Sequence, residues 1–123
     1  MERVTGIGGV FFKAKDPKAL AAWYEKHLGL AFGDQSYTGF NAKGGEHTAF
    51  SFFKQDSDYF APSTSPFMIN FRVKDLDALL AALKEEGVSV GEKTESADYG
   101  KFGWIMDPEG NKIELWEAVD EKL

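Results

Sequence analysis

The stretch FFKAKDPKALAA at residues 11–22 recurs 59 residues later as NFRVKDLDALLA at residues 70–81. Each stretch passes from a strand-like pattern into a helical one through an aspartate, Asp16 or Asp75, and aspartate is a preferred N-cap residue. Two strand–helix boundaries can resemble each other simply because both obey the same capping rules. The matching order of elements around the two stretches is a second, separate likeness. The two observations together predict an internal duplication.

The first half of the chain predicts one helix and four strands. Apolar residues recur at helical spacing between Pro17 and Gly29, where proline suits the first helical turn and glycine suits the position after the last. Strands are expected at residues 6–15, 30–33, 36–41 and 47–54.

The second half predicts the same order of elements. A helix is expected between Asp75 and Gly87, and strands are expected at residues 67–73, 88–95, 101–106 and 111–117. Residues 55–66 between the halves are polar and contain two prolines, which indicates a loop. We therefore expect an α+β fold in which two tandem β-α-β-β-β modules form a single domain over residues 1–123. Module one covers about residues 4–56, a linker about 57–66 and module two about 67–119.

The composition limits the partners of the protein. The 14 Lys and Arg residues against 20 Asp and Glu residues give a formal net charge of −6, which argues against binding to nucleic acid or to anionic membrane surfaces. Cysteine is absent, so the chain has no disulfide, thiolate metal site or cysteine nucleophile. No apolar run approaches the roughly 20 residues of a membrane span, and the N-terminus lacks a signal-peptide pattern, so we expect a cytoplasmic protein.

Alternation along the strands predicts a hollow face with a mixed lining. A helix that follows a strand covers one face of the sheet, so the less uniformly apolar side chains point to the other face. This open face carries Phe11, Met68, Asn70, Arg72, Glu114 and Trp116, with Phe53 and Trp104 as further candidates. Apolar walls with few polar groups are typical of small-molecule sites. The alternatives are a surface packed against a partner subunit and a second core layer.

The stretches FRVKDLDALLAALKEEGV (71–88) and YGKFGWIMDPEGNKIELWE (99–117) carry a family resemblance. Together with the paired modules, they resemble the glyoxalase / bleomycin-resistance / extradiol-dioxygenase superfamily, also called vicinal oxygen chelate proteins. The resemblance covers nearly the whole chain. It implies eight strands that curl into an open cup, a small-molecule ligand and a homodimer, and pairing of exposed sheet edges also favours a dimer.

The resemblance implies four metal-ligand positions in the cup for metal-dependent members. Here these positions correspond to Gly9, Ser51, Met68 and Glu114. Glycine has no side chain and a thioether suits divalent cations poorly, so only Glu114 is an ordinary ligand. We therefore expect no metal-ligating residues and no cofactor. The alternative is a divalent metal held in a shifted alignment that uses His47, which otherwise is expected at the surface where a strand begins.

Three functions follow from these expectations. The first is binding of a small organic molecule without a metal, as in bleomycin-resistance proteins. The second is a metal-dependent lyase, isomerase or dioxygenase. The third is a metal-free enzyme in which Glu114 is the general base, because burial beside Trp116 and Met68 raises the pKa of a carboxyl group. An ion pair of Glu114 with Arg72 or Lys112 would lower that pKa instead.

Two further residues are expected near the opening of the cup. Arg72 at the rim has the geometry to bind a carboxylate or phosphate, although a solvated charge at a strand end is an equal alternative. Tyr99 lies in an expected loop beside the mouth, where the resemblance implies contact with substrate.

Overall fold

The first half of the chain folds into three strands and one helix. We describe residues 3–42 and 44–120 of a computed structural model of the protein. The elements of this half are β1 (Val4–Ala14), α1 (Pro17–Leu28), β2 (Tyr37–Asn41) and β3 (His47–Lys54). The strand expected at residues 30–33 does not form, because the backbone N–H groups of Phe32 and Gly33 both donate to Oε1 of Glu25, over 2.9 and 2.8 Å.

The second half contributes one helix and five strands. Its elements are β4 (Phe67–Val73), α2 (Leu76–Glu85), β5 (Ser89–Val90), β6 (Glu95–Ala97), β7 (Gly100–Met106) and β8 (Lys112–Ala118). The single strand expected at residues 88–95 is thus two short strands, which pair with different ends of β7.

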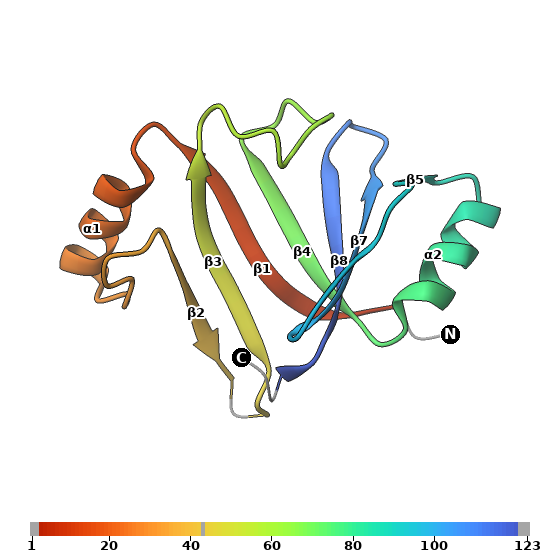
Figure 1. Ribbon diagram of the computed structural model, residues 1–123, viewed down its shortest axis with the longest axis horizontal. Helices are drawn as coiled ribbons and strands as arrows, with labels where there is room; N and C mark the ends of the chain where they lie inside the picture. The colour runs from red at the N-terminus through yellow and green to blue at the C-terminus, as the bar shows by residue number, and fades with distance from the viewer. Residues whose placement is uncertain (1–2, 43, 121–123) are drawn as a thin grey trace.

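The eight strands form one mixed sheet in which the central strands of the two halves pair in the same way. Its order is β2-β3-β1-β4-β8-β7-β5, with β6 also paired to β7. The first strands of the halves, β1 and β4, lie antiparallel at the centre, and each pairs in parallel with the last strand of its own half, β3 or β8. Figure 1 shows the sheet curving between α1 and α2, which flank its two ends. The predicted α+β fold is confirmed.

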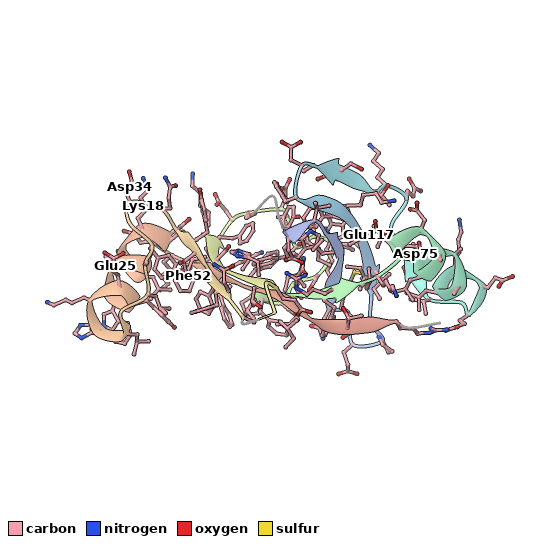
Figure 2. All side chains as sticks on the ribbon, turned by 90° about the horizontal axis from the view of Figure 1, so that it is seen from below. Lys18, Glu25, Asp34, Phe52, Asp75 and Glu117 are labelled. Carbon is pink, nitrogen blue, oxygen red and sulfur yellow. The ribbon has the colours of Figure 1, made fainter. Side chains whose placement is uncertain are left out.

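The two helices begin in the same way, 59 residues apart. Asp16 and Asp75 are both extended at the N-cap, and each carboxylate accepts a hydrogen bond of 3.1 Å from the backbone three residues later. Oε1 of Glu117 on β8 accepts a further bond of 2.9 Å from the N–H of Leu76, and Figure 2 shows Glu117 beside Asp75 at this end of α2. These caps fix where each helix leaves its strand.

Each helix covers its own part of the sheet with a separate core. Under α1, Ala14, Ala21, Phe32 and Phe52 are buried together, and Figure 2 shows Phe52 beside that helix. Under α2, the corresponding cluster is Val73, Leu76, Leu79 and Leu115. No helix of residues 3–42 and 44–120 is long and apolar enough to cross a membrane.

Candidate functional site

A cavity of about 550 Å³ lies on the side of the sheet that the helices leave free. On β3, Phe52 packs toward α1, whereas its neighbours Ser51 and Phe53 line the cavity, as strand alternation requires. Aromatic side chains make up much of the wall: Phe11, Phe53, Tyr59, Tyr99, Phe102 and Trp116. The volume falls within the range of ordinary small-molecule sites.

Glu114 on β8 is the buried acid of this cavity, with only 2% of its surface exposed. Its Oε1 accepts a hydrogen bond of 2.6 Å from Nδ2 of Asn70, and its Oε2 accepts bonds from the Tyr59 hydroxyl and, over 2.9 Å, from Nε1 of Trp104. Burial raises the pKa of Glu114 above its usual value, against the smaller lowering by these donors. Burial and the neighbouring charge of Glu114 likewise raise the pKa of Tyr59.

Lys112 lies near Glu114 but does not form an ion pair with it. Its Nζ donates to the backbone oxygen of Tyr59 over 2.8 Å and lies 5.4 Å from the ring centroids of both Tyr59 and Trp104. Burial lowers the pKa of Lys112. The Lys112 ammonium therefore holds the backbone of Tyr59 and makes no direct ion pair with the Glu114 carboxylate.

Arg72 on β4 is turned away from Glu114. Its Nη1 and Nη2 donate to the two carboxylate oxygens of Asp120, over 2.9 and 2.5 Å, and its guanidinium carbon lies 4.8 Å from the Trp116 ring centroid. The alternative in which Arg72 pairs with Glu114 is wrong, because the Arg72 guanidinium forms its ion pair with Asp120. A free cationic clamp at the rim is also wrong, since Arg72 is only 5% exposed and does not line the cavity.

His47 enters the cup, as the less favoured alternative predicted. Its ring lines the cavity, and its Nδ1 lies 3.0 Å from Oδ1 of Asn41. The backbone N–H of His47 donates to Asp120 over 3.1 Å, and its carbonyl oxygen accepts from Arg72. The Arg72–Asp120 pair therefore holds the start of β3, and with it the imidazole, against the cavity.

The residues on the floor of the cup do not fit a divalent cation. Ala49, Gly9, Asn70 and Glu114 lie side by side on β3, β1, β4 and β8. Of these four, only Asn70 and Glu114 carry oxygen ligands, and they already bond to each other. Divalent cations need three or more well-placed donors. The part of the chain that the structure describes holds no cluster of three or more His, Asp or Glu residues arranged for a metal.

Six of the nine residues singled out from the sequence line the cavity: Phe11, Phe53, Asn70, Tyr99, Glu114 and Trp116. The other three are placed differently. Met68 is fully buried in a cluster with Phe11, Trp104 donates a hydrogen bond to Glu114, and Arg72 forms an ion pair with Asp120. Whether the six contact a ligand stays a prediction.

Tyr59 is the main lining residue that the sequence reasoning missed. It comes from residues 55–66, which were expected to form only a loop, and its ring stacks on Phe53 with centroids 5.3 Å apart. Its neighbour Phe60 is fully buried against Phe11 and Met68. The adjacent aromatics Tyr59 and Phe60 inside a polar segment were the available signal, because exposed linkers rarely carry two large apolar side chains.

Comparison with solved structures finds the same fold in proteins of low sequence identity. A methylmalonyl-CoA epimerase from Mycobacterium tuberculosis superimposes with a TM-score of 0.68 at 22% identity, covering 97% of this chain and 91% of that one. A methylmalonyl-CoA epimerase from Streptomyces coelicolor in complex with 2-nitronate-propionyl-CoA gives 0.71 at 17%, covering 94% and 99%. A glyoxalase/bleomycin resistance protein/dioxygenase superfamily member from Vibrio splendidus gives 0.60 at 16%, covering 95% and 99%.

Sequence comparison places the chain in a family. No curated protein matches it. The model of the Glyoxalase/Bleomycin resistance protein/Dioxygenase superfamily matches residues 6–115, which is most of the chain. The protein therefore belongs to the glyoxalase/bleomycin resistance protein/dioxygenase superfamily.

Proposed function

We propose that the protein binds a small, largely aromatic or apolar organic molecule in the cup and does so without a divalent metal. The observation that carries this proposal is a cavity of about 550 Å³ whose aromatic wall surrounds one buried carboxylate. Such a wall supplies hydrophobic and stacking contacts, while Glu114 fixes the orientation of the ligand.

The chemistry of the floor supports binding over metal-dependent catalysis. In the row Ala49, Gly9, Asn70 and Glu114, two positions carry no ligating atom. The remaining carboxylate accepts hydrogen bonds from three side chains, which compete with a cation for its oxygens.

A thermal-shift screen of mono- and bicyclic aromatic compounds, run in the presence of EDTA, tests the proposal. A ligand that binds only the folded state stabilises it by about 2.7 kcal/mol at a hundredfold excess over Kd, which raises Tm by several degrees. The proposal predicts a set of related compounds that shift Tm with EDTA present. A library that shifts Tm only after a divalent cation is added would contradict it.

A second function, metal-free proton abstraction beside a carbonyl group, is favoured by the raised pKa of Glu114. A carboxylate whose pKa lies nearer to neutrality is a stronger general base. Methylmalonyl-CoA is a reasonable first probe, because the fold is shared with methylmalonyl-CoA epimerases. NMR in deuterated water with EDTA would detect uptake of deuterium beside the carbonyl, which Glu114→Gln should abolish. Absence of exchange in the unaltered protein would exclude this probe as a substrate.

A further inference from the structure

Two polar side chains on the floor of the cup, Glu114 and Asn70, keep unused hydrogen-bond acceptor positions. A carboxylate offers about four acceptor positions, and Glu114 uses three of them for Tyr59, Trp104 and Asn70. The single bond at Oε1, from Asn70, leaves one position on that oxygen. Glu114 therefore keeps an acceptor although it is almost fully buried.

Asn70 supplies a second acceptor beside the first. Its residue surface is 1% exposed, its Nδ2 donates one hydrogen bond to Glu114, and its Oδ1 has no hydrogen-bond partner. The amide cannot turn over, because its oxygen would then face the carboxylate of Glu114. An unpaired buried acceptor costs free energy, which a donor from a ligand would recover.

The space that this oxygen occupies depends on a glycine. A Cβ atom built on Gly8 would lie 2.2 Å from Oδ1 of Asn70 and 2.8 Å from the Trp116 ring. Gly8, Asn70, Glu114 and Trp116 all line the same cavity. The absence of a side chain at Gly8 therefore leaves room for the Asn70 amide at the floor.

Most donors of the positively charged side chains near this floor are engaged, and within the described residues only the buried Nε of Arg72 has no partner. Arg72 binds Asp120 and the carbonyl oxygen of His47, and Lys112 binds the carbonyl oxygen of Tyr59. Neither Arg72 nor Lys112 lines the cavity, whereas the acid Glu114 does. The surrounding aromatic faces add an attraction for cations that they do not offer to anions.

We infer that the cup recognises its ligand through a cationic N–H donor group, of the amidinium, guanidinium or primary ammonium class, which bridges Glu114 and Asn70. This inference rests on the proposed function and adds the chemical class of the ligand. An amidinium suits the floor because it presents several N–H donors, one positive charge and no acceptor. A carboxylate or phosphate has the opposite properties, so we expect the floor itself to bind either group more weakly than an amidinium.

Three bicyclic probes that share one ring system test this inference: naphthalene-2-carboxamidine, naphthalene-2-carboxamide and naphthalene-2-carboxylate. Isothermal titration calorimetry at neutral pH with EDTA gives the Kd of each. The amidinium is expected to bind at least about tenfold more tightly than the amide, with the carboxylate weakest. Equal binding of amidinium and amide, or tightest binding of the carboxylate, would overturn the inference.

The variants Glu114→Gln and Asn70→Ala test whether the preference for the amidinium over the amide depends on the floor of the cup. Glu114→Gln should reduce the ratio of amide Kd to amidinium Kd to near one, whereas Asn70→Ala keeps the acid and should reduce this ratio only in part. A ratio between probes is unaffected if part of the protein is unfolded. Glu109→Gln is the matched control, because it removes the same charge from the exposed turn after Pro108 and should keep the ratio. An unchanged ratio in Glu114→Gln would refute the role of the acid.

The outcomes also separate this inference from the function on which it rests. If the amide binds and the amidinium has no advantage, the cup still binds aromatic molecules and only the donor class is wrong. If none of the three probes binds, the inference fails, and the aromatic library decides separately on the proposed function.

Discussion

The hydroxyl of Tyr59 donates a hydrogen bond to Oε2 of Glu114, so the segment between the two halves of the chain reaches the acid at the floor of the cup. The same tyrosine stacks on Phe53 and is held by Lys112 through its backbone oxygen. Tyr59 thus connects the wall of the cavity, the acid that lines it and the segment between the two halves of the chain.

Tyr59→Phe tests this connection. Loss of a hydrogen bond to a buried carboxylate should lower the free energy of unfolding by about 1 kcal/mol or more. Loss of the same donor should raise the pKa of Glu114 further. Urea denaturation measures the first effect. Tyr37→Phe is the control, because Tyr37 is 59% exposed, and it should leave the stability nearly unchanged. If Tyr59→Phe and Tyr37→Phe lower the free energy of unfolding equally, the hydrogen bond between Tyr59 and Glu114 does not stabilise the protein as described.

Glu114 should leave a signature in the pH dependence of stability. Its pKa is raised in the folded state from an ordinary value of 4.5, so folded protein binds this proton more tightly than unfolded protein. The free energy of unfolding should therefore fall as the pH rises from 4.5 to the folded pKa. The lowered pKa values of Asp107 and Asp120 act below their ordinary 3.8 and leave this window clear.

Urea denaturation of the unaltered protein and of Glu114→Gln, from pH 4.5 upward to neutral, isolates this contribution. The unaltered protein should lose stability relative to the variant across the window. A difference that is constant with pH, or that changes in the opposite direction, would show that the carboxyl group is not penalised by burial.

Asp120→Asn should destabilise the protein, because it removes the negative charge that faces the buried guanidinium of Arg72. Because the Asp120 side chain is 30% exposed, the loss should be that of hydrogen bonds between charged groups, about 1.5–3 kcal/mol. The exposed pair of Lys101 and Asp77 is the control, and Asp77→Asn should have little effect. Chemical denaturation compares the two. The imidazole of His47 should also change its NMR chemical shift in Asp120→Asn alone, since Asp120 holds its backbone.

Gly8→Ala should disturb the floor of the cup. The new Cβ would lie 2.2 Å from Oδ1 of Asn70, so the amide or the strand must move. Overpacking of this kind costs about 1–3 kcal/mol, and ligand affinity should fall with it. Gly44→Ala is the matched control, because a Cβ there meets nothing within 4 Å. If both variants behave like the unaltered protein, the floor is not as closely packed as described.

The elements that the sequence predicted well depend on local rules. The aspartate caps at Asp16 and Asp75 follow from neighbouring residues, and the inward position of Glu114 follows from alternation on a strand with one covered face. The strand expected at residues 30–33 failed because Glu25, on the preceding helix, takes the N–H groups that a strand partner would have bonded.

The contacts that escaped prediction join residues far apart in the chain. Tyr59 meets Glu114 across 55 positions, and Arg72 meets Asp120 across 48. Local patterns indicate that such polar groups need partners, but the partner is chosen by how the sheet curves. His47 shares the cavity face of β3 with Ser51 and Phe53, so alternation along this strand already indicates its entry into the cup, and Arg72 and Asp120 hold its backbone there.

The affinity of the best compound from the aromatic screen, measured by calorimetry with EDTA and again with added Mn²⁺, Ni²⁺ or Zn²⁺, tests the central claim most directly. A cup that binds an organic molecule through Glu114 and its aromatic wall should give the same Kd in every case. Binding that disappears with EDTA and returns with one of these cations would contradict it.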